Sequence, residues 1–544
     1  MAGLARARRS LLAGVSLGAV VMAAQAWGQS PPEEPFAPVN RRIESSDLSP
    51  VQLPPDLWRG LDAGAITKWL AAQTAPPRSP GLAGLWRRLM LAVEEAPPAA
   101  APQPGNEVGL ARLEALYRSG LVSEIGEVLA KRGAAGAAAQ LWHARIDIGL
   151  GAREKGCKTL AGPMASLPSK ALRAEKQLLS GYCAAVAGDT RAAALAASLA
   201  REEGSTSELA LGILGSLDGG VDNRPPLPDR LSLIDYRFLE LTGPVDSDRA
   251  LKEAEPALLV ALAGNTALAA KVQVAAAEAA LRLNAMPPEA VAKVYRRLPA
   301  SKSGAAPDRA LKRAQLFRDL EETQTPAVRA RLTRTLLDEA RRAGVLLQTA
   351  RMLAPAFSNL WPGPDMGVMA ESLVQIALVG GQLDLARRWA ESAVSLQHWL
   401  ALIDIADPQA RHVQQAGLLS LADLAKRGRI SPTALHRVVT VLDALGIDVP
   451  LGLWEAAGRV PQPTGGHLPP TGVLGELAQA SEQKQAGRTI ILAIEALGTD
   501  GPDGANILAL GDTLKALKRA GLEADARHLA LEALLAIWPG TSGS

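Results

Sequence analysis

A short pattern of small residues recurs along this chain. In each copy a glycine is followed five residues later by an alanine, and seven residues after that by a second alanine. Alanines at this spacing lie two turns apart on one helical face, and a glycine just ahead of such a helix is typical of a tight helix–helix turn. The pattern therefore predicts a stacked, recurring helical hairpin, in the copies Gly188–Ala193–Ala200, Gly264–Ala269–Ala276, Gly381–Ala386–Ala393 and Gly521–Ala526–Ala533.

Composition favours a large all-helical chain. Aromatic residues make up only 3% of the 544 residues, which disfavours a large sheet, whereas Ala and Leu are strong helix formers. The hydrophobic fraction of 48% is ordinary for a folded protein. Because the copies of the pattern are unevenly spaced, we expect an all-α fold that forms an irregular right-handed superhelix of stacked helical hairpins rather than a uniform rod.

The N-terminus has the parts of a secretory signal peptide. Three arginines precede an apolar run over residues 11–24, which ends at the small-residue site Ala24–Gln25–Ala26. The run is shorter than the roughly 20 residues that a membrane helix needs, although an uncleaved anchor is the alternative. We expect cleavage near Ala26, a periplasmic location, and no integral membrane segment after cleavage.

Removal of this segment changes the charge balance. The chain has 58 Lys and Arg against 55 Asp and Glu, and residues 1–26 hold three arginines and no acid. The remaining chain therefore carries equal numbers of basic and acidic residues. A neutral surface argues against nucleic-acid binding, which needs a basic stripe, and against purely electrostatic attachment to anionic lipid.

The chain has two cysteines, Cys157 and Cys183. An even number of cysteines in an exported protein favours a disulfide. A regular hairpin between them would place Cys183 much farther from the turn than Cys157. A bridge therefore requires an irregular stretch around Gly162–Pro163 and Pro168. We expect the bridge, and two buried free thiols are the alternative.

Stretches rich in proline and glycine divide the chain into segments. One such stretch, APPAAAPQPGN at residues 96–106, has the proline content of an extended linker. We expect, in order, a signal peptide, a Pro-rich lead-in, a short helical segment, a Pro/Ala linker and four blocks of helical repeats, at residues 1–26, 27–56, 57–95, 96–106, 107–217, 228–353, 367–458 and 473–544.

The spacing of Gly188, Ala193 and Ala200, and of the matching positions in the other copies, resembles the turn and second helix of tetratricopeptide repeats. The resemblance implies an α-solenoid whose small residues let paired helices pack closely. Gly188 would turn the chain, and Asp189 can cap the second helix.

The whole chain is also similar to a set of Ala-rich exported proteins of alphaproteobacteria. The stretch from Cys157 to Cys183-Ala-x-x-Ala-Gly-Asp carries this similarity, together with the C-terminal AGLEADARHLALEALLA. Some members of that set are labelled antifreeze-glycopeptide-like. This chain contains no Ala-Ala-Thr tripeptide, so we do not apply that label to it.

No motif for catalysis, a cofactor or a metal stands out. The sequence has no G-x-S-x-G elbow, P-loop or G-x-G-x-x-G, and no histidine lies at ligand spacing from another. We expect no catalytic residue, cofactor site or metal site, and interpret the histidines as surface or loop residues, with His467 beside two glycines of a loop: His143, His398, His412, His436, His467 and His528.

The remaining candidates are a carboxylate, arginine pairs and tryptophans. Glu371–Ser372 resembles the Glu-Ser pair of lytic transglycosylases, but the Gly-Leu-Met-Gln and aromatic-Asn motifs are absent. We interpret Arg341–Arg342 and Arg387–Arg388 as solvated helix faces. Tryptophans near breaks or helix ends are either core residues or interaction anchors, at Trp361, Trp389, Trp399 and Trp454.

These observations favour a non-enzymatic periplasmic scaffold. Its partner would be a protein or peptide of the cell envelope, because solenoids bind along their surfaces. The alternatives are a peptidoglycan-acting enzyme or accessory module, similar to lytic transglycosylases, and a self-assembling structural protein.

Overall fold

The computed structural model describes residues 53–54, 56–72, 76–92, 107–131, 136–164, 167–217, 228–298, 308–410 and 412–540. Within these ranges every regular element is a helix, and β-pairing is limited to the isolated bridges Leu231–Ala254 and His467–Ala505. The predicted all-α class is therefore confirmed. The predicted signal peptide with Ala24 and Ala26, most of the lead-in and the linker lie outside the described residues.

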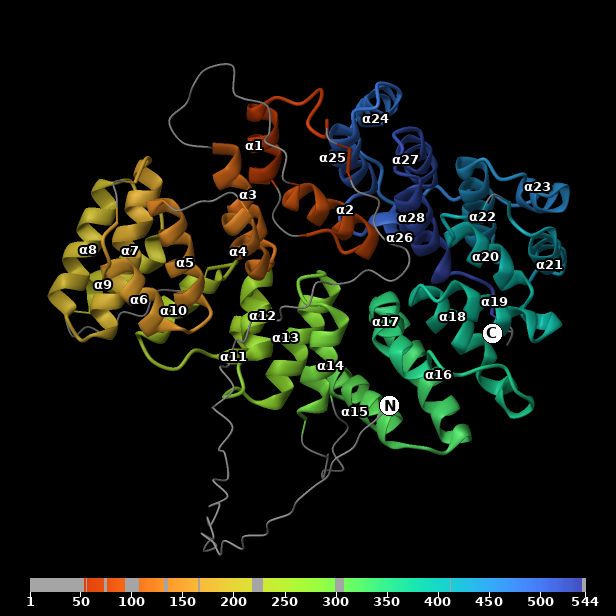
Figure 1. Ribbon diagram of the computed structural model, residues 1–544, viewed down its shortest axis with the longest axis horizontal. Helices are drawn as coiled ribbons and strands as arrows, with labels where there is room; N and C mark the ends of the chain where they lie inside the picture. The colour runs from red at the N-terminus through yellow and green to blue at the C-terminus, as the bar shows by residue number, and fades with distance from the viewer. Residues whose placement is uncertain are drawn as a thin grey trace, which may run out of the picture.

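The helices follow one another closely along the chain (Figure 1). The first group comprises α1 (Ala63–Ala72), α2 (Pro80–Leu91), α3 (Glu107–Arg118) and α4 (Val122–Lys131). The second comprises α5 (Ala137–Gly149), α6 (Arg153–Ala161), α7 (Lys170–Val186), α8 (Thr190–Glu202), α9 (Glu208–Ser216) and α10 (Leu233–Glu240). The third comprises α11 (Ser247–Glu253), α12 (Pro256–Gly264), α13 (Ala270–Arg282), α14 (Pro288–Arg296), α15 (Arg309–Glu322), α16 (Pro326–Arg342) and α17 (Leu346–Phe357).

Two further groups complete the chain. One holds the 3₁₀ helices η1 (Pro364–Met369) and η2 (Val394–Leu396) among α18 (Ala370–Val379), α19 (Leu383–Glu391), α20 (His398–Ala406), α21 (Gln415–Lys426), α22 (Pro432–Leu445) and α23 (Leu451–Gly458). The last comprises α24 (Val473–Glu482), α25 (Ala486–Leu497), α26 (Gly501–Gly504), α27 (Ile507–Arg519) and α28 (Glu523–Leu535). No helix of the described ranges combines the length and apolarity that a membrane crossing requires.

One predicted boundary differs from the structure. The repeat block was expected to end at residue 353, but α17 continues to Phe357 and contains Pro355. Proline is costly in a helix interior because it lacks an N–H donor and its ring clashes with the preceding turn. Pro355 lies in the last turn of α17, and no further helical turn follows that the proline could disrupt.

One turn geometry recurs between successive helices. A residue with positive φ follows the helix, and the next N–H donates to a carbonyl five residues earlier, which is the Schellman arrangement. In the α7–α8 turn Gly188 has a φ of 82° and the Asp189 N–H donates to the Ala184 carbonyl at 2.9 Å. The same bond joins Leu121 to Leu116, Ala152 to Asp147, Ser205 to Ala200, Ala285 to Ala280, Val345 to Ala340, Gln382 to Ala377, Arg429 to Leu424, Ile447 to Leu442, Gln485 to Ala480 and Leu522 to Leu517.

This turn reveals repetition that the alanine pattern did not find. Three pairs of these left-handed turn residues lie an equal distance apart in the sequence, 37 residues in each case. The pairs are Gly151 and Gly188, Gly344 and Gly381, and Lys484 and Gly521. Asn284 and Lys484 occupy the left-handed position with φ values of 53° and 57°. A search for glycine followed by two alanines misses both of these turns.

The alanines of the pattern are mostly interior. The second copy departs from the prediction, because Gly264 is the last residue of α12 and α13 begins only at Ala270. Ala269 is thus an exposed N-cap rather than a packing residue. The alanines with no exposed surface are Ala193, Ala200, Ala276, Ala386, Ala526 and Ala533.

The third copy also departs from the prediction at its second alanine. Helix α19 ends at Glu391, so Ala393 lies beyond it, half-buried just before η2. Gly264 therefore does not form the expected tight turn, and Ala269 and Ala393 lie outside the second helices of their hairpins, although Ala393 still packs against the core. The connection after Gly264 is longer than one tight turn, and α19 is too short to include its second alanine.

A glycine-to-alanine pair tests the turn geometry. Gly188→Ala should destabilise the protein by about 1–2 kcal/mol, because a Cβ is strained in the left-handed conformation, although no atom lies within 4 Å of its Cβ position. Gly212 lies inside α9 and also has open space around it. Gly212→Ala should stabilise by about 0.5–1 kcal/mol. Urea unfolding followed by circular dichroism measures both, and effects of the same sign would contradict the assignment.

The chain curves so that its first helices lie beside its last (Figure 1). Helix α2 packs against α25 and α28, and the residues before it are held from two sides. The Asn284 side chain donates from Nδ2 to the carbonyls of Pro77 and Arg78, both at 2.9 Å. The Arg78 N–H donates to the Thr499 carbonyl at 3.0 Å. Residues 76–92 thus connect the middle of the chain to its C-terminal helices.

Candidate functional site

The two cysteines join α6 to α7. The Sγ atoms of Cys157 and Cys183 lie 2.00 Å apart, with the Cα atoms 5.6 Å apart, so the pair is bridged. Helix α6 ends at Ala161 and α7 begins only at Lys170. This long connection lets Cys183, near the end of α7, lie opposite Cys157 in the middle of α6.

Loss of the bridge has a predictable cost. The cysteines are 26 residues apart in sequence, and the loop-entropy relation assigns such a bridge about 3–4 kcal/mol. Cys157→Ser with Cys183→Ser should lower the free energy of unfolding by this amount. Alkylation of the unreduced chain, followed by mass spectrometry, checks the bridge itself. Two alkylated thiols would contradict it.

A buried polar junction holds the start of α2 against α28. The Glu532 carboxyl accepts a hydrogen bond from the Ser79 hydroxyl, and its Oε1 accepts from the Gly81 N–H at 2.6 Å. Ser79 is also the N-cap of α2, where its Oγ accepts from the Leu82 N–H. Beside it, Arg88 of α2 pairs with Asp525 of α28. A serine cap near the N-terminus therefore fixes the C-terminal helix in place.

Helix α17 completes this junction through Arg351. The Arg351 Nη2 donates to the Nε2 of His528 at 2.9 Å, and that nitrogen lies 3.7 Å from Glu532 Oε1. Because Nε2 accepts, His528 is the neutral imidazole with its proton on Nδ1. Burial, together with the positive charges of Arg351 and Arg88, lowers the pKa of His528 to about 3. Burial raises the pKa of Glu532 to about 7.

The junction contains a serine, a histidine and a carboxylate but lacks the geometry of a nucleophilic site. The Ser79 hydroxyl donates to Glu532, while the His528 Nε2 faces Arg351. A nucleophilic serine needs a histidine as its base. The Nε2 of His528 instead accepts a hydrogen bond from the Arg351 guanidinium. The arrangement holds three chain segments together. Sequence patterns could not reveal it, since its residues are far apart in the chain.

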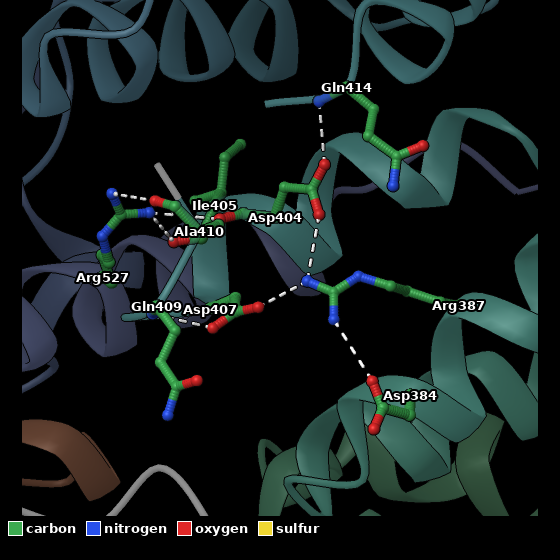
Figure 2. A network of polar contacts seen from close by, with 9 residues as sticks. All are labelled: Asp384, Arg387, Asp404, Ile405, Asp407, Gln409, Ala410, Gln414 and Arg527. Atoms are coloured by element: carbon green, nitrogen blue, oxygen red, sulfur yellow. Dashed lines mark hydrogen bonds and ion pairs between the residues drawn. The ribbon is translucent and has the colours of Figure 1, made fainter. Parts of the chain in front are cut away.

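A second network, shown in Figure 2, joins α19 to the end of α20. Arg387 lies between Asp404 and Asp407, with its Nη2 3.2 Å from Asp404 Oδ1. The other Asp404 oxygen accepts from the Gln414 N–H, and Asp407 accepts from the Gln409 N–H, both at 2.8 Å. The interpretation of Arg387 as solvated is therefore wrong.

Arg527 of α28 holds the same loop from the opposite side (Figure 2). It is buried, and its guanidinium donates to the carbonyls of Asp404, Ile405 and Ala410 at 3.1, 3.3 and 3.4 Å. A guanidinium suits this task because it carries several donors in a fixed plane. The loop after α20 is thereby fixed to the C-terminal helix.

A cavity of about 410 Å³ opens where α3, α5 and α7 meet. Its polar residues include Glu114, Arg145 and Glu175, one from each helix, and Trp142 forms part of its wall. The sequence contains no spacing that predicts this meeting. Each residue lies on a different hairpin, so only the packed structure brings them together.

The tryptophans that the sequence singled out divide into two kinds. Trp389 and Trp399 are core residues with at most 1% of their surface exposed, whereas Trp361 and Trp454 are about half exposed. The Arg388 guanidinium lies over the Trp361 ring, 4.3 Å from its centroid. Trp454 lies on α23 and has no such cover from an arginine among the described residues.

The histidines have structural surroundings. His467 pairs through its backbone with residues 504–506, and its Nε2 lies 3.1 Å from the Glu495 carbonyl. His398 is not a surface residue as expected, but is buried with its Nε2 2.8 Å from the Pro539 carbonyl. Over the described ranges, no three His, Cys, Asp or Glu side chains gather as metal ligands.

Helices α21 and α23 pack together at the edge of the molecule (Figure 1) and carry exposed large apolar side chains. We define the α21/α23 patch as Leu419, Leu451 and Trp454, whose surfaces are 55%, 72% and 48% exposed. Leu451 and Trp454 lie three residues apart and share a face of α23. A Cβ atom placed on Gly452 of α23 would lie 3.6 Å from the Ala422 Cβ on α21, and Ala422 is one turn from Leu419.

Family models, curated proteins and solved structures were each compared with this chain, and none of them matches it.

Proposed function

We propose that this chain is an exported, non-enzymatic scaffold that binds another protein of the cell envelope. The recurring hairpin turn supports an irregular superhelix related to tetratricopeptide solenoids, and the signal-like N-terminus supports a periplasmic location. The α21/α23 patch carries the proposal. Large exposed apolar side chains grouped on one surface are typical of protein–protein contacts.

The patch suits a partner with an apolar face of its own. Trp454 offers a large rigid surface at low entropic cost. The exposed ion pair between Glu455 of α23 and Arg459, which follows the helix as its C-cap, supplies a polar edge. An apolar centre with a polar rim is the usual anatomy of an interface.

Site-specific photo-cross-linking in intact cells tests this proposal. A photoreactive residue replaces Leu419 or Trp454 in turn. The control position is Leu195 on α8, which is 62% exposed and lies in a different part of the molecule. We expect a discrete adduct with one other envelope protein from the patch positions and not from Leu195.

Two results would overturn the proposal. An adduct of the chain with a second copy of itself would assign the patch to self-assembly. A clearing band in a peptidoglycan zymogram that disappears with Glu371→Gln would assign an enzyme, because Glu371 lies in the first turn of α18 and a general acid is what that chemistry requires.

A further inference from the structure

The cavity between α3, α5 and α7 contains two carboxylates and one cation. The Arg145 guanidinium lies 4.1 Å from the Tyr117 ring centroid and 4.8 Å from that of Trp142. Its Nη1 and Nη2 lie 2.7 and 3.4 Å from the Glu114 oxygens. Its Nε lies 3.4 Å from Glu175 Oε1. The Arg145 guanidinium lies against two aromatic rings and forms ion pairs with both carboxylates.

Glu175 is the less well compensated of the two acids. It makes no hydrogen bond within the described part of the chain, and its ion pair with Arg145 is the longer one. Burial, with the nearby charges of Glu114 and Asp235, outweighs Arg145 and raises the pKa of Glu175. Burial also opposes ionisation of Glu114, but Arg145 and Arg118 outweigh it and lower the pKa of Glu114.

Apart from Ser169, the rest of the lining is apolar. Leu110, Leu141 and Leu172 contribute hydrocarbon surface. Trp142 is 4% exposed, and its indole N–H has no acceptor among the described residues. A buried polar group without a partner is uncommon in a folded protein, but this nitrogen is enclosed by the protein, so Trp142 lines the cavity through its ring carbons. The site thus has two carboxylates against one guanidinium, and an aliphatic wall.

We infer that this cavity binds an aliphatic ammonium ion, either the side chain of a lysine in a peptide or a free diamine. The ammonium group would donate to Glu175 and restore charge balance, because a charged donor and a partly buried carboxylate form a strong hydrogen bond. The alkyl chain would lie against the leucines. This binding goes beyond the proposed scaffold role and does not depend on it.

Calorimetric titration of the purified chain tests the inference with defined probes. Cadaverine represents a free diamine, and Nα-acetyl-lysine amide represents lysine in a peptide. 1-Pentanol has a similar chain without the charge. We expect both amines to bind with dissociation constants of about 1 mM or below, which corresponds to roughly 4 kcal/mol, and pentanol not to bind. The tighter of the two amines identifies the source of the ligand.

Two variants locate the site. Glu175→Gln should weaken binding of either amine by about tenfold or more, since it removes the charge that receives the ammonium group. Glu203→Gln is the matched control, because Glu203 pairs with Arg173 and does not line the cavity, and should leave the affinity within about twofold. Leu172→Trp, which fills the cavity without changing charge, should also abolish binding.

Thermal unfolding of each variant confirms that it folds before titration. Equal binding of pentanol and cadaverine would show an apolar cavity with no preference for a cation. Unchanged affinity in a folded Glu175→Gln variant, or no binding by the unaltered chain, would overturn the inference.

Discussion

Arg387→Ala should lower the free energy of unfolding by about 3–5 kcal/mol. Asp404 and Asp407 are almost fully buried, and Arg387 is the cation that lies between them. Removal of one partner of a buried ion pair leaves an uncompensated charge, which is the costly case. Urea unfolding of the variant and of the unaltered chain measures the difference.

The neighbouring arginine is a matched control. Arg388 is exposed and lies over the half-exposed ring of Trp361, a contact of about 0.5–1 kcal/mol at an exposed site. Adding Asp404→Asn to Arg387→Ala should recover part of the loss, since it removes one of the two unpaired charges. A loss no larger for Arg387→Ala than for Arg388→Ala would contradict the network in Figure 2.

Glu532→Gln should stabilise the protein by about 3 kcal/mol at pH 8 and have little effect at pH 4. Burial raises the pKa of Glu532 to about 7 from an ordinary value of 4.5, so the fold prefers the protonated carboxyl. The stability that Glu532 contributes is fully present below pH 4.5 and is lost as the pH rises to about 7. Glutamine is neutral at every pH and avoids this loss.

His528 makes the opposite contribution. The fold lowers the pKa of His528 to about 3. The stability that His528 contributes is therefore fully present above about pH 6.5, which is its pKa in the unfolded chain, and is lost as the pH falls toward 3. Between pH 4.5 and 6.5 the two groups therefore offset each other in the unaltered chain. In Glu532→Gln only the contribution of His528 should remain. The free energy of unfolding of this variant should therefore decrease as the pH is lowered from 6.5 to 4.5.

Unfolding midpoints measured from pH 4 to pH 8 for both proteins test this account. The difference between them should grow as the pH rises and level off above about 7. A difference that is constant with pH would show that Glu532 does not titrate at the junction. A variant less stable than the unaltered chain at pH 8 would show that Glu532 folds as a carboxylate.

Local features of the fold could be predicted from the sequence, because they depend on residues close together in the chain. Gly188 turns the chain and Asp189 caps α8, where its side chain accepts from the Ala192 N–H. The cysteine pair also follows from local reasoning, once the connection from α6 to α7 is allowed to be irregular. The pattern failed at Ala269 and Ala393, where helix length rather than the glycine decides which residues are buried.

The polar sites could not be predicted in the same way. Ser79 reads as an ordinary helix cap in the sequence, and Glu532 as one of many surface acids in an Ala-rich helix. Their contact depends on the packing of α2 against α25 and α28. No local sequence pattern predicts this packing. Arg145 likewise reads as one charged residue on an amphipathic helix, and only the packing of three hairpins surrounds it with Glu114 and Glu175.

The proposed scaffold role is tested most directly by purification of the tagged chain from cross-linked cells, followed by mass spectrometry. If the chain is a scaffold, we expect one or two envelope proteins to be recovered in stoichiometric amounts with the unaltered chain. The same proteins should be lost when Leu451→Ala and Trp454→Ala are combined, and retained with Leu195→Ala. Recovery of the chain alone, or partners that are indifferent to the α21/α23 patch, would contradict the account.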